Sequence, residues 1–454
     1  MAQVALKEKM PLRLEIEEID ESKNIVATYI ASAPNDDWKP SRIDVVVPDL
    51  CEYHGVLWST AGTDVGIGVG DSHASPTAAL LLSVLQESMG RIATILFAHR
   101  LGTSLEPECK MYRLAADIFN DSAMILDCLS PALPKASRVV LLSLSSVLRS
   151  LCGVAAGSSK ASLSAHFATQ GNLGELNAVI RAKLMPCKKD SSQETIISLL
   201  GMLVGSLVVS HISSKWATWS VMIALLAIHL GTNYLAVRAV SMRTLNRQRA
   251  NIVSSNIFET VYQKIHAAKE QSPSDTELLS IMIPSPEEVS VKERVFEKDG
   301  VLRWKGRKPL GYCRIGVDVR TILNLFGKPN RSSGSYSEDQ SVTFAKLLDI
   351  YKEDGYIMWY DEPRKTFLIV LKDTAQTTTH LQAWMHALYH AEASNLGRLQ
   401  DEETVLDALA STKTYVAKVL DHFAVFEELQ KAGWDIETGA METKSGTRIK
   451  VKSL

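Results

Sequence analysis

The acidic side chains best placed for chemistry lie in the segment AADIFNDSAMILD. Asp117 and Asp121 are four residues apart, so a helix brings them to one face, with Asn120 about a quarter-turn away. Among apolar helices such acids would act as a proton or cation site or as ion-pair partners, because carboxylates are costly to bury there. The sequence favours a plainer interpretation, a solvated polar face.

Two further polar pairs lie downstream of these acids. Lys160 and His166 are six residues apart in GSSKASLSAHF, and we expect them either to meet the acidic face or an anionic ligand, or to be ordinary surface residues. His229 and Asn233 lie on one face of an apolar segment. A hydrogen bond between helices is a more common role for such a pair than metal binding.

The glycine-rich stretch TDVGIGVGDSHASPT resembles a phosphate loop only superficially. A dinucleotide loop starting at Gly66 needs glycine at position 71, which is Asp71, and no glycine here starts a P-loop with its lysine. We expect closely packed backbone leading into a helix at Ser75-Pro76, and anion binding at that helix N-terminus is the alternative. The binding candidates here are Gly66, Gly68, Gly70 and Asp71.

The chain carries no recognisable catalytic or metal motif. It lacks G-x-S-x-G, H-E-x-x-H and an EF-hand loop, and its six cysteines include no C-x-x-C pair. We therefore expect a non-enzymatic protein with no resident metal or cofactor. The net charge of -2 gives no electrostatic support for nucleic-acid binding.

Residues 195–212 and 216–237 contain no Lys, Arg, Asp or Glu, and only SSK separates them. A bilayer core takes about 20 apolar residues in helical form, so a transmembrane hairpin is predicted, with buried core helices as the alternative. Gly201 and Gly205, four residues apart, leave a strip of the first helix without side chains, so another helix backbone can approach it closely. Basic residues at both outer ends place them on one side of the membrane: Lys188, Lys189, Arg238, Arg243, Arg247 and Arg249.

The predicted fold is mostly α, with a helical N-terminal domain of apolar, membrane-associated helices and a smaller α+β C-terminal domain. LRLEIEEI alternates apolar and polar residues, which predicts a strand, and GYIMWY and TFLIVLK predict a hairpin. The predicted boundaries are a leader over 1–44, the helical domain over 45–250, a helix and linker over 251–300, and the α+β domain over 301–454.

Six motifs occur in an order that resembles the root UVB-sensitive family of membrane-associated proteins: GVGDSHASPTAAL, RLAADIFNDSAMILDCLSP, CGVAAGSSKASLSAHFA, GNLGELNA, DSSQETIISLLGMLVG and NYLAVRAVSMRTLNRQR. The resemblance implies a link to vitamin B6 homeostasis and action in pairs, and it supplies no catalytic residue. One departure is VIRAKLMPCK, residues 179–188, which is either a surface loop or an artefact of the gene model.

The function expected from these features is that of a scaffold or a small-metabolite carrier in the membrane of an intracellular organelle. Membrane lipids and a second copy or another family member are the expected partners. The alternative is a peripheral or soluble protein that binds a pyridoxal-type or phosphate-bearing ligand. Lys160 is then the lysine that an aldehyde would reach, an idea that rests on the resemblance alone.

Overall fold

The computed structural model describes residues 13–32, 42–46, 76–105, 107–167, 201, 203, 205–207, 214–270, 281–330, 335–399, 404–442 and 446–453. The chain divides into two compact units. One is Trp58–Met242, called here the helical unit. The other combines Met1–Leu57 with Arg243–Leu454 and is called the α/β unit.

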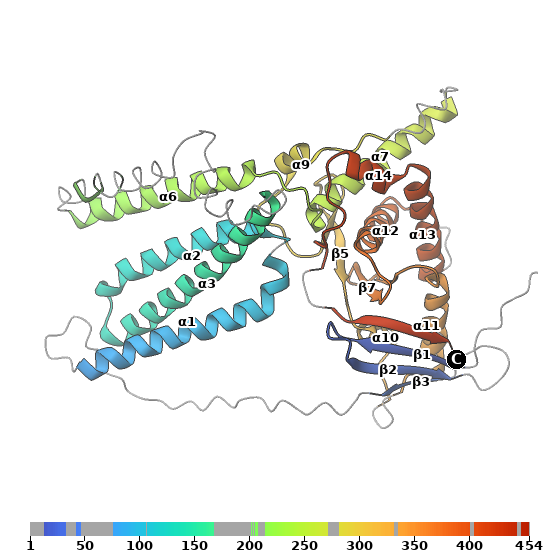
Figure 1. Ribbon diagram of the computed structural model, residues 1–454, viewed down its shortest axis with the longest axis horizontal. Helices are drawn as coiled ribbons and strands as arrows, with labels where there is room; N and C mark the ends of the chain where they lie inside the picture. Colours follow the sequence, from blue (N-terminus) through green and yellow to red (C-terminus); the bar gives the residue numbers. More distant parts are fainter. Residues whose placement is uncertain are drawn as a thin grey trace, which may run out of the picture. The chain divides into compact units, whose positions relative to one another are not determined.

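The described part of the helical unit consists of long helices. They are α1 (Pro76–Leu105), α2 (Cys109–Leu129), the short 3-10 helix η1 (Ser130–Ala132), α3 (Lys135–Phe167) and α6 (Lys215–Ala239). The short connection through η1 makes α2 and α3 antiparallel neighbours. Helix α3 packs against both α1 and α2, and α6 packs against α2 (Figure 1). Helix α1 begins at Pro76, as the Ser-Pro pair predicts.

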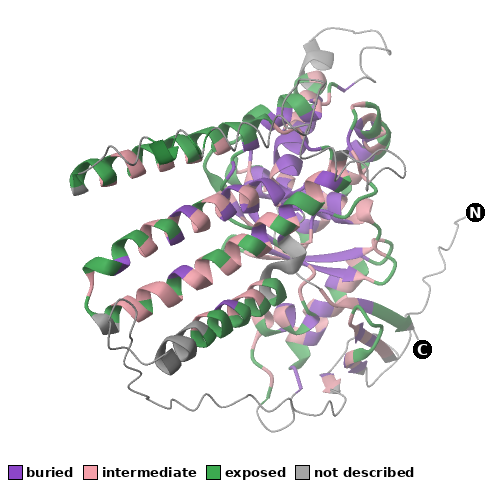
Figure 2. Cartoon of the chain, turned by 60° about the vertical axis from the view of Figure 1, so that its left-hand side comes forward, coloured by how far each residue is buried: buried purple, intermediate pink, exposed green. Residues whose placement is uncertain are grey.

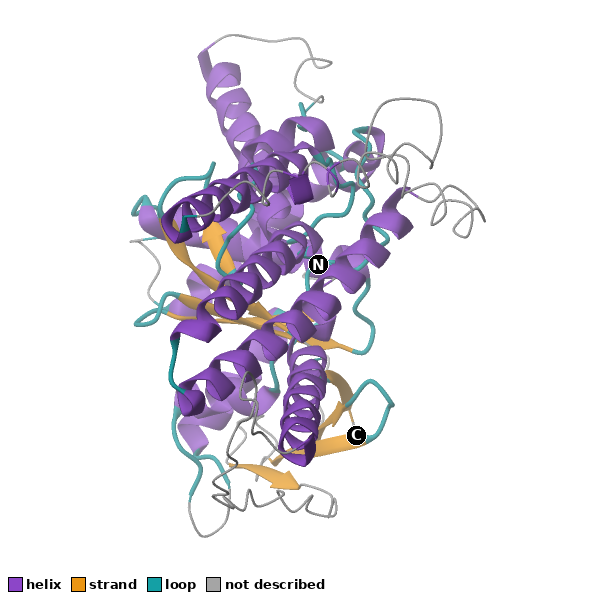
Figure 3. Cartoon of the chain, turned by 90° about the vertical axis from the view of Figure 1, so that its left-hand side faces the viewer, coloured by secondary structure: helices purple, strands orange, loops and turns teal. Residues whose placement is uncertain are grey.

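The α/β unit contains both strands and helices (Figure 3). Its strands are β1 (Arg13–Ile19), β2 (Ile25–Ser32), β3 (Arg42–Val46), β4 (Val301–Arg303), β5 (Pro309–Ile315), β6 (Tyr356–Asp361), β7 (Thr366–Lys372) and β8 (Arg448–Ser453). Its helices are α7 (Arg247–Glu270), α9 (Pro286–Lys292), α10 (Val319–Phe326), α11 (Glu338–Ile350), α12 (Thr377–Asn395), α13 (Val405–His422) and α14 (Val425–Lys431). The mostly helical character with a mixed sheet agrees with the prediction.

The strands form one sheet in the order β3-β2-β1-β8-β7-β5-β4, and β6 pairs with β7. The β6–β7 pair is antiparallel, so the predicted hairpin is confirmed. Strand β7 is parallel to both β5 and β8. Its first half pairs with β5 at Thr366–Ile369, and its end pairs with β8 at Leu371 and Lys372.

The N-terminal strands are an integral part of this sheet, because β1 pairs with β8 at the other end of the chain. Glu18, only 2% exposed, anchors the joint: it accepts hydrogen bonds from the Tyr29 hydroxyl, the Thr447 hydroxyl and the Val319 backbone amide. Val319 begins α10, whose N-terminus favours a carboxylate. The sequence predicts a leader here that is separate from 301–454, whereas the structure joins the two in one sheet.

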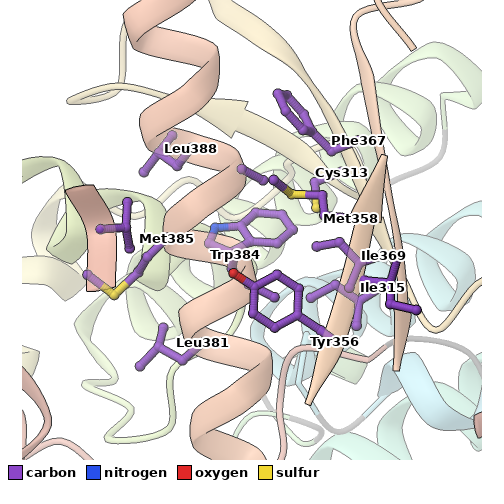
Figure 4. Packing of buried hydrophobic residues seen from close by; sticks show 14 of the residues in the cluster. Cys313, Ile315, Tyr356, Met358, Phe367, Ile369, Leu381, Trp384, Met385 and Leu388 are labelled. Carbon is purple, nitrogen blue, oxygen red and sulfur yellow. The ribbon is translucent and has the colours of Figure 1, made fainter. Parts of the chain in front are cut away.

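The core of the α/β unit lies where α7 and α12 meet the sheet. Trp384 of α12 is fully buried, and Figure 4 shows its indole ring pointing toward Met358 of β6. Its Nε1 donates a hydrogen bond of 3.0 Å to the Asn251 side chain of α7, whose amide in turn donates to the Val301 carbonyl of β4. Apolar burial and this short polar chain together fix the helices on the sheet.

A buried histidine pair makes the stability of the α/β unit sensitive to pH. His386 and His390 both donate to the Thr412 hydroxyl at 3.0 Å, and the His386 Nδ1 accepts from Tyr356. This network holds both rings neutral. Burial lowers the pKa of His386 well below its usual value and that of His390 to about 4.

We therefore expect the α/β unit to lose stability as the pH falls from 6.5 toward 4. The unfolded chain binds these protons at a higher pH than the folded chain does. The free energy of unfolding therefore falls by about 1.4 kcal/mol per pH unit for each histidine. Denaturant unfolding at pH 7 and pH 5 measures the loss. The variant carrying both His386→Gln and His390→Gln should show a flatter dependence, and equal slopes for variant and wild type would refute this assignment.

Candidate functional site

The predicted acidic face exists on α2, and it is not solvated. Asp121 is 3% exposed, and the Asp117 side chain is 13% exposed. The solvated-face interpretation is therefore wrong for both carboxylates, because neighbouring helices cover the face of α2 that carries them. Sequence periodicity places side chains on a common face but does not say whether water or another helix meets that face.

His229 of α6 pairs with Asp121 across the two helices. Its Nδ1 lies 3.0 Å from the Asp121 Oδ2, and its Nε2 accepts a hydrogen bond of 2.9 Å from the Asn233 side-chain amide. A neutral imidazole has one donor and one acceptor nitrogen, so Nδ1 donates to the carboxylate. The interhelical hydrogen bond predicted for this pair is confirmed. The cost of burying Asp121 is offset by a partner 108 residues away.

Asp117 completes the group, here called the Asp–His cluster and defined as Asp117, Asp121, His229 and Asn233. Its Oδ1 lies 3.9 Å from the Arg113 guanidinium, and within the described structure its buried Oδ2 has no hydrogen-bond partner. The two carboxylates exceed the single arginine by one negative charge, and His229 is the other group here that can carry a positive charge. Uptake of one proton or cation would balance the excess negative charge.

The other polar residues singled out from the sequence lie outside the cluster. Asn120 is half-buried and donates to the Met124 sulfur. Cys152 of α3 is close enough to Asp117 to interact with it electrostatically. Lys160 is exposed and lies eight residues further along α3, a rise of about 12 Å. His166 is hydrogen-bonded to the Ser241 carbonyl at 3.1 Å. The structure therefore does not bring Lys160 and His166 to the acidic pair.

Several predicted features lie partly or wholly outside the described residues. These include Gly66, Gly68, Gly70, Asp71 and the segment 179–188. Of the predicted helix 195–212, residues 201, 203 and 205–207 are described, and they are helical and exposed. A Cβ added to Gly201 or Gly205 would meet no atom within 4 Å among the residues that the structure describes, so this strip is open with respect to them.

The helices around the cluster are exposed over much of their length (Figure 2), and many of their exposed side chains are apolar. On α6, Leu225, Ile228 and Leu235 are 61%, 64% and 66% exposed. Among the described residues, two helical stretches are long and apolar enough to cross a membrane by length and composition alone: Ser137–His166 and Trp216–Ala239. The second agrees with the predicted 216–237, whereas the first was not singled out from the sequence.

The basic flank after α6 is smaller than the sequence indicated. Arg247 and Arg249 are buried in the α/β unit, at 6% and 1% exposure. Arg249 pairs with Glu293, and Arg247 donates to the Met441 carbonyl and to Asp299. These two arginines therefore anchor α7 inside protein, and only Arg238 and Arg243 of the predicted flank after α6 are exposed.

Comparisons with known proteins support the family resemblance that the six motifs indicate. A family model described as the vitamin B6 photo-protection and homoeostasis domain matches residues 49–261. Protein root UVB sensitive 3 of Arabidopsis thaliana is 34% identical over 397 residues, which are 86% of this chain and 76% of the relative. The chain belongs to the root UVB-sensitive family.

Other relatives of the family differ in length or similarity. RUS family member 1 of Dictyostelium discoideum is 34% identical over 304 residues, 66% of this chain but only 50% of that protein. Protein root UVB sensitive 2, chloroplastic, of Arabidopsis thaliana is 24% identical over 79% of this chain and 70% of its own length. No solved structure gives a significant match. The matched vitamin B6 domain contains the whole Asp–His cluster.

Proposed function

We propose that this root UVB-sensitive protein is a non-enzymatic membrane carrier for a small metabolite of vitamin B6 homoeostasis, located in an intracellular organelle. The observation that carries the proposal is the Asp121–His229 pair, in which the Asp121 side chain is buried and the His229 side chain is 46% exposed, on helices whose outer faces are apolar. Ionisable groups among membrane helices are costly and mark substrate, ion or proton pathways. Proton uptake at His229 or Asp117 would change the charge of the cluster during transport.

A scaffold function is the second candidate, and the open strip at Gly201 and Gly205 favours it. Glycines four apart let another helix backbone approach closely in lipid. A second copy or another family member would occupy the strip, with membrane lipids around the remaining apolar faces. This role leaves the Asp–His cluster without a function of its own, which is why the carrier is preferred.

The carrier function is tested by flux into liposomes that contain the purified full chain. The probes are pyridoxine, pyridoxal and pyridoxal 5′-phosphate, with and without a pH gradient. We expect gradient-dependent uptake of at least one probe by the wild type. Asp121→Asn should reduce it to the level of protein-free vesicles, because the amide cannot hold the charge that pairs with His229.

Glu87→Gln is the matched control for this experiment. Glu87 is an exposed carboxylate on α1 of the same unit, paired with Arg91 at 2.7 Å. Its loss should leave flux unchanged, since exposed pairs contribute little. Unaltered uptake in both Asp117→Asn and Asp121→Asn would exclude the carrier. Binding of a probe by protein that needs no membrane would favour the peripheral alternative.

A further inference from the structure

A cavity in the α/β unit lies among α7, α12, α13 and the turn between β4 and β5. Its volume of about 180 Å³ slightly exceeds the roughly 150 Å³ of an apolar cavity known to hold benzene. It therefore has room for one ring with a small substituent. The side chains around it that matter most are Tyr262, Trp304, Arg307, Tyr389, Arg398 and Tyr415.

The wall of the cavity is a continuous series of aromatic rings contributed by separate elements. Phe258 of α7 stacks on Trp304, with ring centroids 6.1 Å apart and 13° between the planes. Tyr389 of α12 contacts Phe258 at 5.0 Å and stacks on Tyr415 of α13 at 4.4 Å. Such a wall favours a flat partner, because offset stacking stabilises planar rings beyond simple burial.

Arg398 is held at the rim by the backbone that ends α12. Gly397, with φ of 67°, takes the left-handed conformation, and the Arg398 amide donates to the Ala393 carbonyl at 2.9 Å. This Schellman arrangement reverses the chain direction. It places the Arg398 guanidinium 4.7 Å from the centroid of the Tyr262 ring.

Arg307 is positioned by a second left-handed turn. Lys305 and Gly306 both have positive φ, 46° and 70°, and the Arg307 amide donates to the Trp304 carbonyl at 2.9 Å. Two consecutive positive φ values define a type I′ turn. The turn therefore brings an exposed arginine to the cavity beside Trp304, the ring that forms part of its wall.

Two arginines and two glutamates line the cavity, and Lys305 lies beside the lining. Glu259 is engaged by the Lys305 ammonium at 3.7 Å and by the Trp304 Nε1 at 3.4 Å. Glu392, 7% exposed, opposes the two arginines. Arg307 and Arg398 balance the two carboxylates of the lining, so the adjacent Lys305 adds one positive charge, which a ligand with one anionic group would neutralise.

We propose that this cavity binds a small planar aromatic molecule bearing one anionic group, a carboxylate or a phosphate. The ring would stack against the aromatic wall, and the anion would accept hydrogen bonds from the guanidinium groups of Arg307 and Arg398. The site lies in the α/β unit, apart from the Asp–His cluster. It goes beyond the carrier function and does not depend on it.

The test is titration calorimetry on the full chain in detergent micelles with four probes: phenyl phosphate, benzoate, benzamidine and inorganic phosphate. We expect the two aromatic anions to bind, and benzamidine and inorganic phosphate to fail. Arg398→Gln and Arg307→Gln should each weaken anion binding by about tenfold or more, the value of one charge-assisted hydrogen bond. The better of the two anions identifies the preferred group.

Arg364→Gln is the matched control, since Arg364 is 71% exposed on the turn between β6 and β7 and pairs with Asp361. It should bind the probes like the wild type. Arg307 is exposed, so its variant tests the site even if Arg398→Gln perturbs the end of α12. Benzamidine binding as tightly as the anions, inorganic phosphate binding as tightly as phenyl phosphate, or no anion binding would each overturn the proposal.

Discussion

Replacing Arg249 with methionine is expected to destabilise the α/β unit by about 3–5 kcal/mol, because it removes the guanidinium that pairs with a buried carboxylate. The Arg249 Nε lies 2.9 Å from the Glu293 Oε1, with side chains 2% and 6% exposed. The same guanidinium donates to Thr244, which lies where the chain passes from the helical unit back into the α/β unit. Hydrogen exchange of α7 and α9 amides in the full chain measures the loss.

The double variant Arg249→Met with Glu293→Leu separates charge from packing. A buried ion pair replaced by apolar residues of similar size is often neutral in stability, so the double variant should recover most of the protection. A single variant as stable as the wild type would contradict the buried pair. A double variant no better than the single one would show that the guanidinium matters through other contacts.

Truncating Trp384 to alanine is the second change with a large expected effect, about 3–5 kcal/mol from the lost ring and the cavity left behind. The side chain is fully buried between α12 and the sheet (Figure 4), and its Nε1 bonds to Asn251. Trp384→Phe should cost less, about 1–3 kcal/mol, because it mainly leaves the Asn251 acceptor unpaired.

Exchange protection of β7 and α12 amides checks both Trp384 variants. Trp216→Ala is the control, because Trp216 is 84% exposed on α6 and belongs to the other unit. It should leave protection in the α/β unit unchanged. If Trp384→Ala retained wild-type protection, the packing of α12 on the sheet would be wrong.

The sequence predicted the local elements well because their signals are local. The uncharged run 216–237 is helix α6, and the i, i+4 spacing of Asp117 and Asp121 does put them on one face of α2. Residues Arg13–Ile19 of the stretch LRLEIEEI form strand β1, as its alternation indicates. Helix α3 was missed as an apolar span because serines and the charged residues Arg138, Arg149 and Lys160 interrupt its apolar residues, although a stretch within Ser137–His166 is apolar enough to cross a membrane.

Partners distant in the chain could not be predicted in this way. A period of two identifies β1 as a strand but says nothing about β8, which begins more than 400 residues later. The sequence predicts that Arg247 and Arg249 flank a membrane helix. In the structure they form ion pairs with Asp299 and Glu293 instead. His229 and Asp121 were each noticed, but only the packing of α6 on α2 joins them.

The proposed membrane location of the helical unit is tested most directly by alkaline carbonate extraction of membranes carrying the full chain. The exposed apolar faces of α3 and α6 would be unfavourable in water at this extent, so we predict that the protein stays in the membrane pellet and floats with the lipid. Release into the supernatant as a monodisperse species without detergent would contradict the account.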